Sequence, residues 1–349
     1  MQSGEVKWDG STWMSTAWYN IREKKMTEII LPGSRNAATS ALSRDVANDS
    51  QGIFIQKYRG IIGTYITDKI SEQCNRYQPC SVLEQLKMGV RYIDLSVGFD
   101  STKANPESPL RCCHGFFSTD IGTVLNDVSH FCLQNTLEFV ILDFRRLIFN
   151  TGSNLLEECI NLQLVNEIET RLSNMLVSSQ LWHKKLQTLL LTGQRIFVFY
   201  PSNNNSISWY RDWMIPREFI YTMQPCETVD LFLKNRINLF VKLQNAKHLQ
   251  ILQNKLHPKI DSLFILQATS IKTKYSKFAC FISSLLRYIS GGHVVLCNLP
   301  DDIHTKSVSS NQNILNLIET KYNKAFLNVI LLDFIDSSQI INRITQLNF

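Results

Sequence analysis

Apolar residues along this chain alternate between short β-rich runs and longer stretches with a helical period. The run 27–31 (TEIIL) ends at Pro32-Gly33, which predicts a strand that leads into a loop. Apolar positions in 120–133 recur at i, i+3, i+4 and i+7 and predict an amphipathic helix. The near-continuous apolar run 139–144 that follows is typical of a strand buried on both faces of a parallel sheet.

The same criteria predict further elements along the whole length. Strands are expected at 91–95, 196–200, 263–267 and 329–333, and helices at 81–88, 164–176 and 340–347. This repeated strand–helix alternation, without a linker-like break, predicts a single α/β domain, a TIM-type (β/α)8 barrel, rather than two domains.

We expect residues 1–26 to form an N-terminal extension that packs on a barrel formed by residues 27–349. A doubly wound open sheet is the alternative, although its usual glycine-rich dinucleotide fingerprint is absent, as is a phosphate-binding GxxxxGK[ST] loop. The segment 288–311 has mixed strand and turn signals and predicts no single structure.

The composition, 44% hydrophobic and 19% charged, is that of a globular protein and excludes disordered and fibrous classes. The formal net charge of +6 favours an anionic partner: phospholipid, a phosphorylated ligand or nucleic acid. The densest basic groups, 22–25 and Arg145-Arg146, are too short for a nucleic-acid-binding arm. We therefore expect no nucleic-acid partner.

The nine cysteines include no CxxC pair and no Cys/His ladder, so the sequence predicts no zinc site. The N-terminus has no apolar signal region, and there is no run of ~18 apolar residues that would span a membrane. An odd cysteine count without a signal peptide suits a reducing compartment. We expect a cytoplasmic protein whose contact with a membrane is peripheral, with Cys112 and Cys113 as buried thiols.

Polar residues lie where several predicted strands end. Residues 34–36 follow the first strand, Asp94 and Ser96 end the second, His114 precedes a glycine, and 143–146 follow a later strand. Active sites of parallel barrels lie at the C-terminal ends of the strands. Each residue alone is a weak signal, because an aspartate at a strand end is usually a helix cap.

Taken in order, these segments resemble the phosphatidylinositol-specific phospholipase C (PI-PLC) X-domain family. Residues 31–36 (LPGSRN) are similar to its first motif, an apolar residue, Pro, Gly, Thr or Ser, and His, followed by Asp or Asn. Residues 85–95 resemble the second motif, and His114-Gly115 with 138–144 resembles the third. Further similarity, to the small subfamily that has only an X domain, covers almost the full chain. The resemblance implies a barrel of the phosphoric diester hydrolase type.

The family's reaction requires a base and an acid. The inositol 2-hydroxyl attacks phosphorus, one group removes its proton, and another protonates the departing diacylglycerol oxygen. The resemblance places His114 at the general acid position and Arg35 at the general base position. Arginine cannot accept a proton at pH 7. Ser96 stands where the family has Arg or a calcium-binding Asp, and it cannot neutralise charge.

The resemblance also assigns Asn36, Asp94, Asp143 and Arg145 to ligand binding. Asn36 and Asp94 match calcium ligands of some relatives, but Arg145 replaces an acidic ligand. We therefore expect no Ca²⁺ and no other cofactor.

These substitutions predict a pseudoenzyme of lipid metabolism that binds a phosphoinositide or another phosphate group through Arg35, Arg145 and Arg111. Three alternatives stay open. The pocket is closed by an ion pair of Arg35 with Asp94 or Asp143, the protein is a weakly active phosphodiesterase with His114 as acid, or it is a protein-interaction scaffold. The oligomeric state is unknown.

Overall fold

Eight parallel strands form the centre of the fold in the part of the chain that this computed structural model describes. That part comprises residues 8–103, 109–201, 211–223, 263–267, 311–312, 315–316, 328–335 and 338–349. The strand order is β7-β6-β5-β2-β1-β10-β9-β8, so the first and last strands in sequence are neighbours. This is the arrangement of the predicted TIM-type barrel. The strands are β1 (Leu31–Ser34), β2 (Tyr92–Phe99), β5 (Val140–Ile148), β6 (Ile196–Tyr200), β7 (Met214–Pro216), β8 (Ile220–Met223), β9 (Leu263–Gln267) and β10 (Val329–Leu332).

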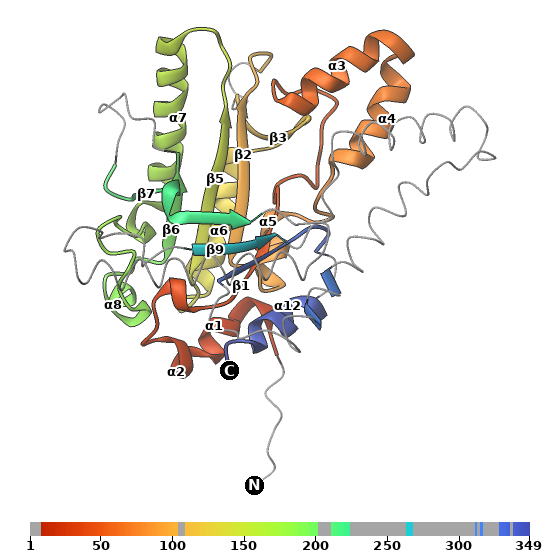
Figure 1. The fold of residues 1–349 in the computed structure, drawn as a ribbon. Helices are drawn as coiled ribbons and strands as arrows, with labels where there is room; N and C mark the ends of the chain where they lie inside the picture. Colours follow the sequence, from red (N-terminus) through yellow and green to blue (C-terminus); the bar gives the residue numbers. More distant parts are fainter. Residues whose placement is uncertain are drawn as a thin grey trace, which may run out of the picture.

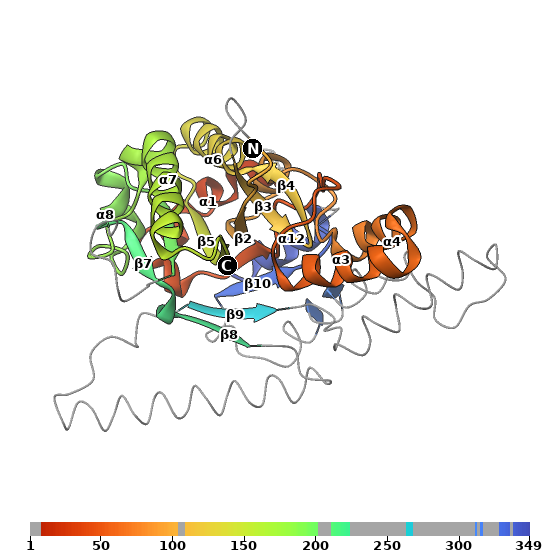
Figure 2. The ribbon, with the colours of Figure 1, turned by 90° about the horizontal axis from the view of Figure 1, so that it is seen from above.

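Helices flank the strands on the outside and close one end. β2 and β5 rise above the other strands, α3 and α4 stand beside their upper ends, and α1, α2 and α12 lie at the opposite end (Figure 1). Seen from above, β8 and β9 run along one side of the molecule, with α6 and α7 on the other (Figure 2). The helices are α1 (Trp13–Thr16), α2 (Trp18–Ile21), α3 (Ser50–Ile62), α4 (Thr64–Asn75), α5 (Val82–Lys87), α6 (Ile121–Gln134), α7 (Asn154–Leu172), α8 (Leu186–Leu191) and α12 (Ser338–Gln346).

The local sequence explains where the helices begin. The Asp120 carboxylate accepts the backbone N–H of Thr123 and so caps α6. Ser81 and Glu84 form a capping box at the start of α5.

No helix in the described part of the chain is long and apolar enough to cross a membrane.

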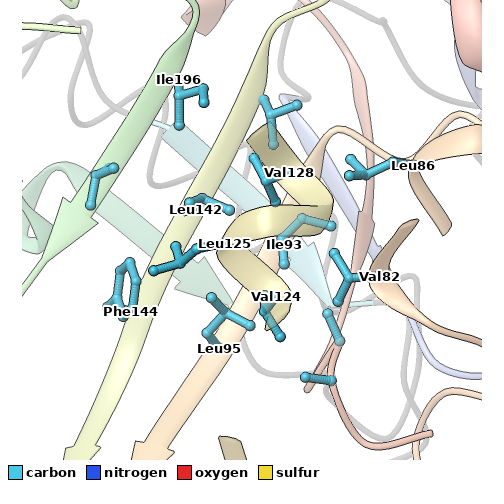
Figure 3. Close-up of a cluster of buried hydrophobic side chains, with 14 of the residues drawn as sticks. Val82, Leu86, Ile93, Leu95, Val124, Leu125, Val128, Leu142, Phe144 and Ile196 are labelled. Atoms are coloured by element: carbon cyan, nitrogen blue, oxygen red, sulfur yellow. The ribbon is translucent and has the colours of Figure 1, made fainter. Parts of the chain in front are cut away.

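Apolar and polar side chains alternate along β2 and β5, so the apolar ones face the helices and the polar ones face the barrel interior. Val124, Leu125 and Val128 of α6 pack on Ile93 and Leu95 of β2, and on Leu142 and Phe144 of β5 (Figure 3). Since successive strand residues point to opposite faces, Asp94 and Asp143 point the other way, into the barrel. The parallel register places these two aspartates directly beside each other.

An antiparallel hairpin, β3 (Leu110–His114) and β4 (Phe116–Asp120), leaves the barrel from β2. Gly115 lies between its two strands with φ +75°, and a Cβ there would meet the side chains of Asn75 and Ile55 at 3.0 Å. Glycine is suited to this positive φ. The hairpin therefore brings His114 to the end of β2.

A buried ion pair ties the N-terminal segment to the other end of the barrel. Arg91 Nη2 lies 2.6 Å from Glu138 Oε2, and both side chains are fully buried. Glu138 also accepts the backbone N–H of Ser15, while Arg91 donates to the carbonyl of Gly10. Trp13 Nε1 donates to the carbonyl of Gly89. These contacts hold residues 10–15 against the barrel.

Several predicted boundaries were wrong. β2 and β5 each continue four residues beyond the predicted strand ends at 95 and 144, and the helix predicted to begin at residue 164 begins at Asn154. The first strand begins at Leu31 rather than Thr27, because Met26–Glu28 forms a 3-10 helix in which the Glu28 carboxylate accepts the N–H of Lys25. The helix predicted to end at residue 176 ends at Leu172. The division at residue 27 remains a prediction, and the segment 288–311 lies outside the described residues except for Asn311.

Replacing Glu138 with Gln should destabilise the protein by about 3–5 kcal/mol, because it leaves the Arg91 charge buried without a counter-charge. Urea unfolding followed by circular dichroism would measure the loss. Glu72→Gln is the control: its i,i+4 pair with Arg76 is more than 40% exposed on both sides, so its loss should be below about 1 kcal/mol. Equal losses in the two variants would contradict the structural role of Glu138.

Candidate functional site

The predicted site residues come together at the C-terminal ends of β1 and β10 and along the adjacent middle parts of the longer strands β2 and β5. Arg35 follows β1, and its N–H donates to the carbonyl of Leu332 in β10. The next residue, Asn36, donates its backbone N–H to Asp94 Oδ2 over 3.3 Å. β2 and β5 contribute Asp94, Ser96, Asp143 and Arg145, and the β3–β4 hairpin contributes His114.

Arg35 is held by a carboxylate that the sequence reasoning did not assign to the site. Its Nη1 lies 3.4 Å from Asp333 Oδ2, and its guanidinium lies over the Tyr77 ring at 4.8 Å from the centroid. Burial opposes the charge on Arg35, but Asp333, Tyr77 and Asp94 together outweigh this effect, and the pKa of Arg35 is raised. The proposed pairing with Asp94 or Asp143 was wrong. Asp333 follows β10, which becomes the neighbour of β1 only when the barrel forms.

The two neighbouring aspartates each have an arginine partner. Arg145 Nη1 lies 3.2 Å from Asp94 Oδ2. Arg217, which sequence reasoning missed, donates to both oxygens of Asp143 at 2.5 and 3.0 Å. Arg217 lies in the 3-10 helix Arg217–Phe219, 74 residues from its partner, and no local pattern marks it.

Tyr92 completes the interior contacts of Asp143. Its hydroxyl donates to Asp143 Oδ2 over 2.6 Å. Burial, followed by the Asp143 charge, raises the pKa of Tyr92 well above its ordinary value. The phenol therefore stays protonated and remains a donor.

Ser96 contacts an arginine from the adjacent strand. Arg146 Nε donates to Ser96 Oγ over 3.1 Å, and Arg146 Nη2 lies 3.5 Å from His114 Nδ1. Burial, and then the nearby Arg145 charge, lower the pKa of Arg146. Ser96 itself carries no charge, as predicted from the sequence, but β5 places the Arg146 cation against it.

His114 is almost fully buried and lies beside a carboxylate. Its Nδ1 is 3.8 Å from Asp49 Oδ2, and the His114 and Tyr77 rings meet edge to face with centroids 4.8 Å apart. Asp49 accepts the N–H of Gly115 and caps α3 through the N–H of Gly52. The start of α3 thus fixes the carboxylate next to His114.

Several buried polar atoms at the ends of β1 and β2 have no hydrogen-bond partner among the described residues. They are Ser34 Oγ, both side-chain polar atoms of Asn36, and Asp94 Oδ1. Buried polar groups are normally hydrogen-bonded, so such a group indicates a place where water or a ligand binds.

These residues do not fit a Ca²⁺ ion. Asn36 and Asp94 offer oxygen atoms, but Arg145 occupies one carboxylate oxygen of Asp94. Within the described ranges there is no group of three His, Cys, Asp or Glu side chains suited to a metal. The expectation of no cofactor remains a prediction.

Arg111, also expected to contribute charge, pairs with two other carboxylates. Its Nη1 lies 3.2 Å from Asp100 and 3.5 Å from Asp45. Its Nε donates to the carbonyl of Ser118. Arg111 therefore braces the β3–β4 hairpin.

Comparisons with known proteins agree with this architecture. No family model matches the chain. The variant-surface-glycoprotein phospholipase C of Trypanosoma brucei brucei is 28% identical over 209 residues, which cover 57% of this chain and 56% of the relative. PI-PLC X domain-containing protein 3 of Danio rerio is 25% identical over 229 residues, which cover 64% of this chain and 67% of the relative.

Solved structures agree as well. A phosphatidylinositol-specific phospholipase C of Staphylococcus aureus superposes with a TM-score of 0.58 at 15% identity, covering 98% of each chain. The fold is thus the predicted TIM-type barrel of the PI-PLC type. The chain is a relative of the PI-PLC X domain-containing proteins, as its motifs predicted. It spans little more than half of the trypanosomal relative.

Cys112 and Cys113 should resist thiol reagents at pH 8. They point to opposite sides of β3, and burial raises the pKa of Cys112 to about 12 and that of Cys113 well above its ordinary value. The thiolate is the reactive form, so almost none is present at pH 8. Mass spectrometry after alkylation should find exposed Cys159 modified in the native protein, and Cys112 and Cys113 modified only after unfolding. Native labelling of Cys112 as fast as Cys159 would contradict this.

Proposed function

We propose that this protein is a pseudoenzyme of the PI-PLC X-domain type that binds a phosphate-bearing ligand, a phosphoinositide headgroup, without cleaving it. The observation that carries the proposal is the ion pair of Arg35 with Asp333. The position that the resemblance assigns to the general base holds a permanently charged arginine. Losing a positioned general base costs ~10²–10⁴-fold in rate.

Two features support retained binding. Buried polar atoms of Ser34, Asn36 and Asp94 lack protein partners in the described part of the chain. Arg146 and His114 lie together beside Ser96 of β2. A site that had closed into a purely structural core would have satisfied these atoms or replaced them with apolar groups.

The ligand class follows from the relatives. The trypanosomal relative is named a phospholipase C and the zebrafish relative a PI-PLC X domain protein. An inositol phosphate group joined to lipid is therefore our proposed ligand. A cytoplasmic location with peripheral membrane contact is part of the same proposal.

The second candidate function is weak phosphodiesterase activity with His114 as general acid. The position of Asp49 beside His114 favours it, because a carboxylate near one ring nitrogen helps to orient the imidazole. The contact of Arg146 with Ser96 also favours phosphodiesterase activity, because the guanidinium could stabilise negative charge on the phosphorane.

Restoring a base should separate these two functions. We expect purified wild-type protein to release no inositol phosphate from phosphatidylinositol vesicles above the His114→Ala background. Arg35→His should raise the release by ~10²-fold or more, because an imidazole beside Asp333 can accept the proton. Ser96 is left unchanged in this variant because its hydroxyl accepts a hydrogen bond from Arg146.

Arg35→Gln is the matched control: it removes the same charge without adding a base and should stay at background. Product release is followed by phosphorus NMR. Turnover by the wild-type protein that His114→Ala abolishes would contradict the pseudoenzyme proposal and establish the second candidate.

A further inference from the structure

We propose that Arg146, rather than Arg35 or Arg145, binds the phosphoryl group of the ligand, and that Ser96 positions it. This inference rests on the proposed function and deepens it, because it names the binding residue. The ligand chemistry is a phosphate monoester or diester, from a lipid headgroup or from a free phosphate.

Charge pairing distinguishes the arginines. Among the described residues, Arg35, Arg145, Arg146 and Arg217 lie at this end of the barrel. Three of them are matched to carboxylates: Arg35 with Asp333, Arg145 with Asp94, and Arg217 with Asp143. A carboxylate already bound to arginine offsets the charge that would attract a phosphate.

Arg146 is different. Its guanidinium contacts the neutral Ser96 hydroxyl and the His114 ring, and among the described residues it forms no ion pair with a carboxylate within 4.0 Å. Asp94 and Asp49 act on Arg146 only from a longer distance. A partly buried cation without a directly bonded carboxylate is unfavourable, and a bound anion reduces that penalty. The lowered pKa of Arg146 has the same physical origin, burial together with the neighbouring Arg145.

A register shift explains how two consecutive arginines reach different partners. Leu95 pairs with Phe144, but Ser96 pairs with Arg146, so Arg145 is left without a strand partner. Such a bulge redirects side chains. Arg145 turns to Asp94 inside the barrel, and Arg146 comes to lie against Ser96 beside His114.

Ser96 suits this arrangement because it is small and uncharged. It is nearly fully buried, and its hydroxyl accepts the Arg146 Nε–H. A large or cationic residue at position 96 would displace or repel the guanidinium. The positive charge that the resemblance places on β2 is therefore contributed from β5 in this protein.

The experiment measures binding to the full chain by titration calorimetry. The three probes are inorganic phosphate, myo-inositol 1-phosphate, and phosphatidylcholine vesicles that contain about 10 mol % phosphatidylinositol, which gives the vesicle surface a negative charge. Arg146→Gln should weaken wild-type binding at least ~10-fold, since a charge-assisted contact to phosphate is lost. Arg146→Lys should recover part of it.

Ser96→Ala should weaken binding about threefold, and Ser96→Thr, which keeps the hydroxyl, should restore it. Arg171→Gln is the charge control: it removes one positive charge from α7, where Arg171 pairs with Glu167, and should leave affinity within about twofold. Circular dichroism confirms that each variant is folded.

The outcomes separate this inference from the function on which it rests. If wild-type protein binds none of the three probes, the proposed function fails. If it binds and Arg146→Gln retains affinity within twofold, or Arg35→Gln or Arg145→Gln loses more, the role of Arg146 is overturned while the function stands. If Arg146→Gln loses affinity for all three probes, the site binds the phosphoryl group itself. If wild-type protein binds only the vesicles and Arg146→Gln loses that binding, the ligand is a lipid-borne headgroup.

Discussion

The parallel pairing of β2 with β5 sets two carboxylates side by side inside the barrel, and the rest of the site depends on neutralising them. Asp94 and Asp143 are in register, and each is about 1% exposed. Two buried like charges at this spacing repel each other in a medium that screens poorly. Arg145 and Arg217 approach from β5 and from the segment after β7, and each binds one of the two aspartates.

Because these arginines are bound to carboxylates, only a few groups in the site remain available for binding or catalysis. Arg35 is bound by Asp333, so the position assigned to the general base carries a fixed charge and a fixed partner. Arg146 keeps a neutral neighbour in Ser96 and lies next to His114. A site of this kind favours holding a phosphate over transferring a proton, because it offers a cation and a donor but no base at position 35.

The opposite end of the barrel uses a similar interaction for a different purpose. Arg91 and Glu138 neutralise each other completely inside the protein, and their remaining hydrogen-bonding capacity goes to the backbone of the N-terminal segment. The hydrogen bonds matter here, since a buried pair contributes little when its lone pairs and protons are unsatisfied. At the other end, buried polar atoms of Ser34, Asn36 and Asp94 have no hydrogen-bond partner among the described residues.

Although it did not indicate β7, β8, the β3–β4 hairpin, α3 or α4, the sequence alone predicted six of the eight parallel strands, several amphipathic helices and the ordered motifs, because periodicity and capping are local properties of the chain. The α6 helix with its Asp120 cap and the buried β5 strand are examples. It also brought Arg35, Asp94 and His114 to one end of the barrel, since parallel strands present their C-terminal ends together. The partners of these residues were decided by the tertiary structure alone. Asp333 reaches Arg35 across 298 residues, Arg217 reaches Asp143 across 74, and a bulge of one residue sends Arg146 to Ser96. No local pattern encodes such pairings, because they exist only once strand register and barrel order place distant side chains within hydrogen-bond range.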